Sequence, residues 1–454
     1  MQVIIIGAVA AGMSTASKLK RLNPKIHVTV FEQGDDVSYG ACGLPYFLSD
    51  VIPNEKQLIA REATAFLEAG IDLRLGHTVR AVDPASKQVT VHDRATDKEF
   101  MQSYDYLVVA TGAKPIRLNV EQGGFSNIHT LNTLQDGRAL KAALNAPNVK
   151  TVAVVGGGYI GLEVVENLHH MNKDILLIER AERVLPNFEP FISKRLQTHL
   201  TEQGVRVKTG QTVRAYGKEA HRGIVKTDTE TYHVDLVIEA IGVRPATAFL
   251  EDTDIARLPN GALLTDATMR TSDADVFAAG DCAAYVHAMT GQPGHYVPLG
   301  THANKAGRVI AEQIVGQDET FSGVLGSSVL KVLDYEVART GFGIQEAEQA
   351  GYTVGTVAIT AKDKAGYYPG AVPIEVMVLY DKKTCQLLGA QMIGKAGVAH
   401  RINSMATALA AGLNAKQFAG LDLAYAPPFS PVYDPLLVAV NQIKCPEHNK
   451  KEEK

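Results

Sequence analysis

The sequence has no apolar run long enough to cross a membrane. Its longest hydrophobic stretches are the size of a strand, and the first of them, Val3 to Ala11, contains Gly7. A membrane-spanning helix needs about 20 consecutive apolar residues, so we expect none. The N-terminus also lacks the basic region and cleavage site of a secretory signal, and we therefore expect a cytoplasmic protein.

The chain also lacks a strong excess of charge. It has 45 Lys and Arg against 49 Asp and Glu, a formal net charge of -4 over 454 residues. So small a net charge creates no strong field, and we expect neither nucleic acid nor a membrane surface as a partner. The composition, 46% hydrophobic and 21% charged, is that of an ordinary globular protein, and the length predicts about three domains.

Cysteine is scarce, with four residues at positions 42, 282, 385 and 445. No two of them have the spacing of a metal site or a redox-active pair, so we predict no metal centre. A reducing compartment would keep all four as thiols. Cys282 and Cys385 are interpreted as small buried hydrophobic residues and Cys445 as incidental to the polar tail, whereas Cys42 lies in a distinctive segment.

A pattern of strand, glycine turn, helix and strand occurs twice. The first copy begins with an apolar strand at residues 2–6, has its helix at 13–22 and ends in Glu32. The second begins with a strand at 152–155 and ends in the same way at Glu179. This is the dinucleotide-binding βαβ unit, and two copies, each with its acid, predict two dinucleotide sites.

The glycines and the acid of each unit have separate tasks. The first glycine permits the tight turn, the second lets the pyrophosphate approach the backbone, and the third lets helix pack on strand. The helix N-terminus offers N–H groups to the phosphates, and the acid accepts hydrogen bonds from ribose hydroxyls. Val9 stands where the first copy should have its middle glycine. We interpret it as a variant whose side chain points away from the phosphates.

Later strands end in residues of the same kind. An apolar strand at 106–110 precedes Thr111 and Gly112, and another ends at Gly242. A third is followed by Gly280 and Asp281, where an acid is well placed to bind the ribityl chain of a flavin.

Together these motifs resemble those of the pyridine nucleotide–disulfide oxidoreductases, flavoproteins that bind two dinucleotides. The resemblance covers the chain from Val3 to about Asp434. It implies an α/β fold with two Rossmann-like dinucleotide-binding domains and a C-terminal α+β dimerisation domain, and hence a homodimer. The implied domains are FAD-binding residues 1–113 and 243–322, NAD(P)-binding residues 114–242 and dimerisation residues 323–454.

The resemblance also implies the cofactor-binding residues. FAD would be held by Gly7, Gly12, Glu32, Thr111, Gly112 and Asp281, and the nicotinamide nucleotide by Gly156, Gly158, Gly161, Glu179 and Gly242. Tyr159 matches an aromatic residue that covers the flavin until the nicotinamide displaces it; simple packing is the alternative. The coenzyme can be NADH or NADPH, because Glu179 would repel a 2′-phosphate while Arg180 could accept one.

The segment around Cys42 indicates the subfamily. Glutathione-reductase-like members have two cysteines five positions apart, but residues 37 and 47 here are Val and Phe. The second sulfur or oxygen must therefore come from the substrate, as a mixed disulfide, a persulfide or a sulfenic acid. Small neighbours would let the Cys42 thiolate lie close to the flavin, which would lower the pKa of the thiol. We predict that Cys42 is catalytic.

Single-cysteine members of the family include NADH peroxidase, water-forming NADH oxidase, coenzyme A disulfide reductase and persulfide reductases. Peroxidases and oxidases carry a histidine in the first glycine turn, where this chain has Ala10, which has no proton to give. Residues 365–370 and 423–429 are similar to the tyrosine motifs of coenzyme A disulfide reductases. In that family the tyrosines enter the site from the partner subunit and serve the leaving thiolate.

The motif match implies Tyr425 and Tyr367 as these residues, with Tyr368 as the alternative to the second. A tyrosine hydroxyl can give a thiolate either a proton or a hydrogen bond. Rigid turns that only pack at a dimer interface are the other interpretation. Coenzyme A (CoA) carries phosphates, so the candidate substrate contacts are cations and polar residues that match the family: Lys18, Arg21, Arg61, Ser38 and Asn304.

The predicted reaction passes hydride from NAD(P)H through FAD to a mixed disulfide of Cys42 with CoA, and reduces CoA disulfide to two CoA thiols. Persulfide or polysulfide reduction by the same cysteine is the first alternative. Peroxidase or oxidase activity is disfavoured by Ala10. A reductase of rubredoxin or ferredoxin and a non-catalytic FAD-bound dimer remain open.

Overall fold

The computed structural model describes residues 1–446, which form two compact units that the chain enters more than once. The first unit contains residues 1–153, 215–226 and 231–324, and the second contains residues 154–214, 227–230 and 325–446.

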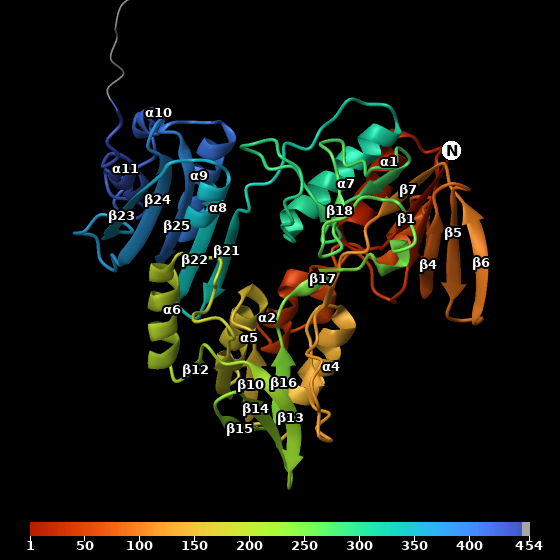
Figure 1. The fold of residues 1–454 in the computed structure, drawn as a ribbon, viewed down its shortest axis with the longest axis horizontal. Coiled ribbons are helices and arrows are strands. Elements are labelled where there is room, and N and C mark those ends of the chain that lie inside the picture. The colour runs from red at the N-terminus through yellow and green to blue at the C-terminus, as the bar shows by residue number, and fades with distance from the viewer. Residues whose placement is uncertain (447–454) are drawn as a thin grey trace, which may run out of the picture. The chain divides into compact units, whose positions relative to one another are not determined.

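The first unit is built mainly from short strands and five α-helices (Figure 1). Its helices are α1 (Ala10–Leu22), α2 (Leu44–Leu48), α3 (Ala63–Glu68), α4 (Leu134–Leu144) and α7 (Gly300–Ile314), with 3-10 turns η1 (Ala41–Gly43), η2 (Glu55–Leu58) and η3 (Ala248–Leu250). Its strands are β1 (Gln2–Ile6), β2 (His27–Glu32), β3 (Asp72–Leu75), β4 (His77–Asp83), β5 (Gln88–Asp93), β6 (Lys98–Ser103), β7 (Tyr106–Val109), β8 (Ala113–Pro115), β9 (Ile128–His129), β15 (Thr231–Val234), β16 (Leu236–Glu239), β17 (Val243–Pro245), β18 (Leu263–Leu264), β19 (Val276–Ala278) and β20 (Ala283–Ala284).

The core of the first unit is a parallel sheet with the strand order β19-β7-β1-β2-β3. Its middle strands consist almost entirely of buried aliphatic residues, as expected for a parallel sheet that is covered on both faces. Helix α1 packs against α7, and Gly307 allows the close approach, because a Cβ there would lie 2.5 Å from the Ala11 carbonyl oxygen. This helix pair covers the sheet beside the first glycine turn.

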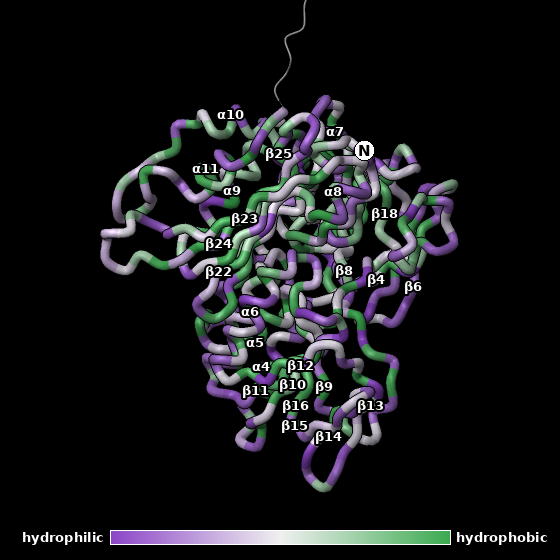
Figure 2. Tube along the Cα trace, turned by 60° about the vertical axis from the view of Figure 1, so that its left-hand side comes forward, coloured by the Kyte–Doolittle hydropathy of each residue, from purple (hydrophilic) through white to green (hydrophobic). Residues whose placement is uncertain are grey.

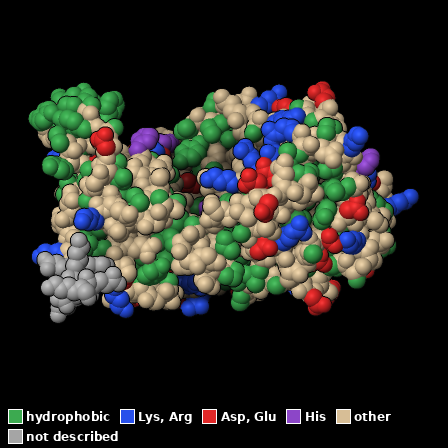
Figure 3. Space-filling model, turned by 90° about the horizontal axis from the view of Figure 1, so that it is seen from above, with side chains coloured by type: hydrophobic (Ala, Val, Ile, Leu, Met, Phe, Trp, Pro, Cys, Tyr) green, Lys and Arg blue, Asp and Glu red, His purple; other side chains and the backbone are tan. Residues whose placement is uncertain are grey.

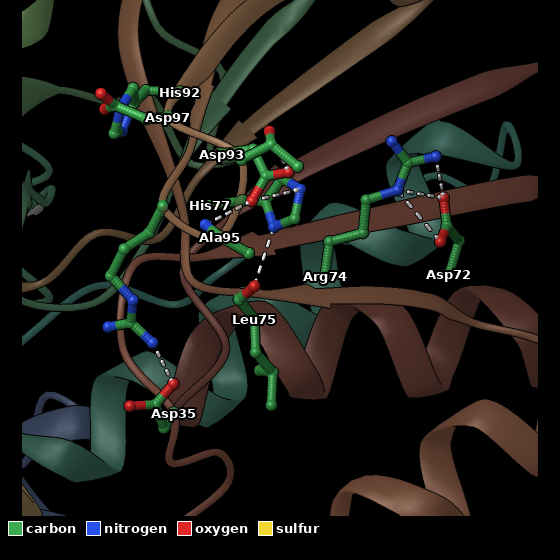
Figure 4. Close-up of polar contacts among 11 residues, drawn as sticks. Asp35, Asp72, Arg74, Leu75, His77, His92, Asp93, Ala95 and Asp97 are labelled. Carbon is green, nitrogen blue, oxygen red and sulfur yellow. Dashed lines mark hydrogen bonds and ion pairs between the residues drawn. The ribbon is translucent and has the colours of Figure 1, made fainter.

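A second sheet of the first unit, β4-β5-β6, is antiparallel. Its polar side chains make contacts around the end of β3 (Figure 4). His77 Nδ1 lies 2.8 Å from the Leu75 carbonyl oxygen, and Arg94 pairs with Asp35. The hairpin therefore holds the loop that follows β2.

The second unit contains α5 (Tyr159–His170), α6 (Pro190–Glu202), α8 (Ile344–Gln349), α9 (Val398–Ala410), α10 (Ala415–Ala419) and α11 (Pro435–Val440). Its strands are β11 (Asp174–Ile178), β12 (Arg206–Lys208), β21 (Ser328–Val332), β22 (Tyr335–Gly341), β23 (Val354–Lys362), β24 (Pro373–Asp381) and β25 (Leu387–Gly394). Strands β10 (Thr151–Val155), β13 (Val213–Glu219) and β14 (Arg222–Thr227) cross the boundary between the units.

The C-terminal part of the second unit is an antiparallel sheet with the order β21-β22-β25-β24-β23, drawn in blue tones in Figure 1. Every residue of β25 is buried, and α9 packs on β22 and β25. Hydrophobic residues follow the strands and hydrophilic residues the outer loops along the trace in Figure 2. Parallel βαβ units followed by this α+β segment are the architecture that the sequence predicts.

The expectation that all four cysteines remain thiols is wrong for one pair. Cys385 and Cys445 form a disulfide, with their Cα atoms 5.8 Å apart. The two residues are 60 positions apart in the sequence, so no spacing motif could reveal the pair. Cys385 is buried, as predicted. Cys282 remains a thiol, and burial raises its pKa to about 11, which fits its interpretation as a small core residue.

Within residues 1–446, none of the helices is both long and apolar enough to span a bilayer.

Candidate active site

The first glycine turn has the geometry of a dinucleotide-binding loop. Gly7 has a φ of +105°, and a Cβ there would lie 2.3 Å from the Ala110 carbonyl oxygen. A Cβ at Gly12 would lie 1.9 Å from the carbonyl oxygen of Gly7. Only glycine fits either position, because both obstacles are backbone atoms.

Helix α1 begins three residues earlier than predicted, inside this turn. Val9 is its N-cap, with no side-chain hydrogen bond to the helix and no acid in the first turn. The first N–H groups of the helix are therefore left for an external acceptor, which favours a phosphate. The φ of Val9 is -105°, outside the left-handed region that favours glycine, so this backbone position does not itself demand a glycine.

Glu32 is tied into the same turn. Its Oε2 accepts a hydrogen bond from the Ala8 N–H at 2.8 Å, and its Oε1 accepts one from the Gly34 N–H at 2.8 Å. Each carboxylate oxygen keeps a second lone pair, which leaves Glu32 able to accept hydrogen bonds from ribose hydroxyls. The ion pair of Asp35 with Arg94 holds the loop beyond Glu32.

Two polar groups beside the sheet fit the hydroxyl-rich chain of a flavin. The Thr111 hydroxyl is buried and makes no hydrogen bond in the described chain. Burial also raises the pKa of Asp281, which follows β19. A buried group of this kind needs a polar partner. With the glycine turn and Glu32, these residues fit FAD.

Cys42 lies in η1 on a loop that is fixed at several points. The Ser38 N–H donates to the Ala8 carbonyl oxygen at 2.9 Å, and the Gly40 N–H donates to the Leu58 carbonyl oxygen at 2.8 Å. Ser38 has a φ of +48°, an uncommon conformation for a residue other than glycine and one that often marks functional sites. The loop that carries the exposed thiol is therefore joined directly to the first glycine turn.

The chain after Cys42 is held against α4. Gly137 leaves room for α2, because a Cβ there would lie 2.9 Å from Leu44 Cδ2. Arg138 forms ion pairs with Asp36 at 2.8 Å and with Glu55 at 2.7 Å. These two acids precede and follow Cys42, so the arginine fastens both ends of the cysteine loop.

The predicted substrate contacts have different environments. Lys18 is paired with Glu312 at 2.7 Å, so its charge is already neutralised. Arg21 and Arg61 have no carboxylate partner among residues 1–446; their guanidinium groups donate to backbone carbonyl oxygens. Asn304 Oδ1 accepts a hydrogen bond from the Ser14 hydroxyl at 2.7 Å, which ties α7 to α1.

The second glycine turn, in the second unit, repeats the first. Gly156 has a φ of +109°. Glu179 Oε2 accepts a hydrogen bond from the Gly157 N–H at 2.6 Å, and its Oε1 accepts one from the Ala181 N–H at 2.7 Å. Among residues 1–446, no atom lies within 4 Å of where a Cβ of Gly158 would stand, which leaves open space above the turn. Gly161 is buried in α5, while Gly242, with a φ of +114°, belongs to the first unit.

Helix α5 carries the predicted Tyr159 and one functional candidate that the sequence analysis missed, Glu163. The hydroxyl of Tyr159, its first residue, is hydrogen-bonded to Ser328 and Asn187. One turn later, burial and the nearby Glu166 raise the pKa of Glu163 to about 7. The four-residue spacing from Tyr159, which places Glu163 on the same helix face, was the only available sequence signal.

The structure brings the two predicted tyrosines together. The hydroxyl oxygens of Tyr367 and Tyr425 lie 3.2 Å apart, and this hydrogen bond raises the pKa of Tyr425. Both side chains are exposed, at 77% and 45%. Tyr368 is 38% exposed and is not part of this pair.

Large hydrophobic side chains are exposed in the segment after Tyr425. Figure 3 shows hydrophobic side chains gathered at the left end of the view, over the C-terminal part of the chain. The segment after Tyr425 exposes Phe429, Val432 and Tyr433, at 78%, 65% and 66%. Exposed apolar side chains so close in sequence are typical of an interaction surface.

The family model for pyridine nucleotide-disulphide oxidoreductase matches residues 1–307, and the model for the dimerisation domain of these enzymes matches residues 327–435. The chain belongs to the pyridine nucleotide–disulfide oxidoreductase family. It is therefore an NAD(P)H-dependent flavoprotein disulfide reductase, and the predicted family, fold class and enzyme class are confirmed. The family implies FAD and NAD(P)H as cofactors.

Relatives of this oxidoreductase carry related but different names. The chain is 37% identical to the NAD(P)H sulfur oxidoreductase (CoA-dependent) of Pyrococcus abyssi, and the matching region covers 97% of this chain and 98% of the relative. It is 30% identical to the coenzyme A disulfide reductase of Staphylococcus haemolyticus, and the matching region covers 94% of this chain and 96% of that relative. The solved structure of an NAD-dependent persulfide reductase from A. fulgidus has a TM-score of 0.92 and 33% identity, covering 97% of this chain and 82% of that one.

Proposed function

We propose that this oxidoreductase reduces CoA disulfide to two CoA thiols, using electrons from NADH or NADPH and Cys42 as the thiol that meets the substrate. The observation that carries the proposal is the fixed loop of Cys42, joined to the flavin-type glycine turn and without a second cysteine for an internal disulfide. The names of relatives that act on CoA disulfide or depend on CoA support the substrate class.

The assigned residues divide into two cofactor sites. When bound, FAD supplies two-electron transfer between the nicotinamide and sulfur. Gly7, Gly12, Glu32, Thr111, Gly112 and Asp281 hold it, and Gly156, Gly158, Gly161, Glu179 and Gly242 hold the nicotinamide nucleotide. The proposed domains are 1–113 with 243–322 for FAD, 114–242 for NAD(P) and 323–454 for dimerisation.

In the sulfur half of the reaction, the Cys42 thiolate attacks one sulfur of CoA disulfide. A mixed disulfide between Cys42 and CoA forms, and one CoA thiolate leaves. Two electrons from the coenzyme then break the mixed disulfide, releasing the second CoA and restoring the Cys42 thiolate. The net reaction consumes one NAD(P)H, one proton and one disulfide and yields NAD(P)⁺ and two CoA thiols.

The tyrosine pair serves the leaving thiolate. Because Tyr367 and Tyr425 share one hydrogen bond, one hydroxyl donates to the other and the acceptor keeps its own proton for a thiolate. In the proposed homodimer this proton donor comes from the partner subunit, across the exposed surface after Tyr425.

The CoA moiety carries phosphates, and the arginines are the better of the proposed contacts. Arg21 and Arg61 have no carboxylate partner in the described chain, whereas Lys18 is paired with Glu312. Ser38 and Asn304 are the proposed polar contacts near the thiol.

Reduction of a CoA persulfide is the second candidate. It uses the same cysteine and the same CoA contacts, and the relatives named as sulfur and persulfide reductases favour it. The two substrates differ in the leaving group, which is a CoA thiolate for the disulfide and a hydrosulfide for the persulfide.

The deciding experiment is intact-protein mass spectrometry of the non-reduced enzyme, repeated after dithiothreitol. A reducible adduct of one CoA per chain that maps to Cys42, and is absent from Cys42→Ser, supports the CoA proposal. An unmodified thiol, together with hydrosulfide release from CoA persulfide faster than turnover of CoA disulfide, selects the second candidate. A Cys42→Ser enzyme that still reduces both substrates would exclude both.

A further inference from the structure

Tyr159 is held by side chains from outside its own helix. Its hydroxyl oxygen lies 2.8 Å from Ser328 Oγ, on β21, and accepts a hydrogen bond from Asn187 Nδ2 at 3.2 Å. Its ring packs at a tilt on Phe188, with the centroids 5.9 Å apart. All these residues belong to the second unit. Ser328 is 169 positions from Tyr159 in the sequence.

The segment that carries Asn187 is itself fixed. The Asn187 carbonyl oxygen accepts a hydrogen bond from Arg339 Nη1 at 2.5 Å. Arg339 is buried and pairs with Glu346. The Glu189 N–H donates to Gln391 Oε1 at 2.7 Å. The C-terminal sheet therefore fixes Asn187 by bonds that do not involve Tyr159.

We propose that Ser328 and Asn187 are positioning residues that hold the Tyr159 ring closed over the nicotinamide position and thereby set the affinity for the coenzyme. This inference rests on the proposed function and on the role that the family resemblance implies for Tyr159, as the residue that the nicotinamide displaces. For the ring to leave, its hydroxyl must give up both hydrogen bonds. Each bond is exchanged for one with water, at a net cost that corresponds to roughly a two- to tenfold change in the closed-to-open ratio.

The affinity for the coenzyme then depends on the open fraction, which is the fraction of molecules whose Tyr159 ring has left the nicotinamide position. When only the open form admits the ligand, the apparent dissociation constant equals the intrinsic one divided by that fraction. Removing an anchor raises the open fraction and tightens binding, without changing any group that touches the coenzyme. The anchors act through Tyr159, so their effect must vanish when the Tyr159 hydroxyl is absent.

The test compares Ser328→Ala with Ser328→Thr in the FAD-loaded enzyme, by calorimetric titration with NAD⁺ and by the rate of flavin reduction at increasing NADH. Ser328→Ala should bind NAD⁺ about two- to tenfold more tightly, and its limiting reduction rate should change less than its affinity. Ser328→Thr keeps a hydroxyl and should bind as the native enzyme does. Asn187→Ala should act in the same direction as Ser328→Ala.

A double-mutant cycle separates anchoring from general damage. In a Tyr159→Phe background, Ser328→Ala should leave the affinity for NAD⁺ unchanged. Unchanged or weaker binding by Ser328→Ala alone, or an effect of equal size in the Tyr159→Phe background, would overturn the inference. If NADH fails to reduce the flavin of the native enzyme, it is the proposed function that fails.

Discussion

At the scale of single residues, a substitution of Cys42 should distinguish the two halves of the reaction, which are reduction of FAD by NADH and reduction of the disulfide. The cofactor-binding turns do not depend on its side chain, because the loop is held by backbone bonds from Ser38, Gly40 and Ala60. We therefore expect Cys42→Ser to keep FAD and its reduction by NADH but to lose disulfide reduction by about 10³-fold or more, as when other enzymes lose their nucleophile. Stopped-flow absorbance and a thiol-release assay measure the two halves. Disulfide reduction that survives in Cys42→Ser would instead favour an electron-transfer role. Cys282→Ser is the matched control, because that thiol is buried.

Glu163 provides a second residue-scale prediction, which concerns pH. Its pKa in the folded protein is raised to about 7 by burial and by Glu166, so the folded chain keeps a proton that the unfolded chain loses at about pH 4.3. This contribution to stability is complete below pH 4.3 and is lost as the pH rises to about 7. Glu163→Gln removes the cost of the buried charge. The free energy of unfolding of Glu163→Gln should match that of the native enzyme at about pH 4 and below and exceed it above pH 7 by on the order of 1 kcal/mol, discounted for partial exposure. Parallel profiles of unfolding midpoint against pH would contradict the assignment.

At the scale of elements, the disulfide ties the chain beyond α11 to the turn between β24 and β25. Cys385 and Cys445 enclose about 60 residues, and closing a loop of this size stabilises a protein by at most about 4 kcal/mol. We expect dithiothreitol to lower the thermal midpoint of the native enzyme and to have no such effect on Cys445→Ser. A free-thiol count on the unfolded, non-reduced protein checks the bond itself, and four titratable thiols per chain would contradict it.

The elements that the sequence predicted are those specified by nearby residues. Both βαβ units lie where their glycines and closing acids, Glu32 and Glu179, indicated. The first helix begins three residues early, because the last residues of its glycine turn already adopt helical geometry. The contacts of Ser328 and the disulfide of Cys385 could not be predicted in this way. Each joins segments far apart in the sequence, and no local pattern reports which strands and turns will meet.

At the scale of the whole molecule, the exposed Tyr367–Tyr425 pair is expected to act on the partner's Cys42 in a homodimer. Three variants test this arrangement: Cys42→Ser, the double variant Tyr367→Phe with Tyr425→Phe, and a 1:1 mixture of the two unfolded and reassembled together. Each variant alone should have little activity. If the tyrosines act across the interface, every mixed dimer contains one site with both Cys42 and the tyrosine pair intact. Half of the dimers are mixed, so the mixture should recover about a quarter of native activity. If the tyrosines act within their own chain, no site is restored and the mixture stays as inactive as its components. Native protein carried through the same reassembly gives the reference for this comparison.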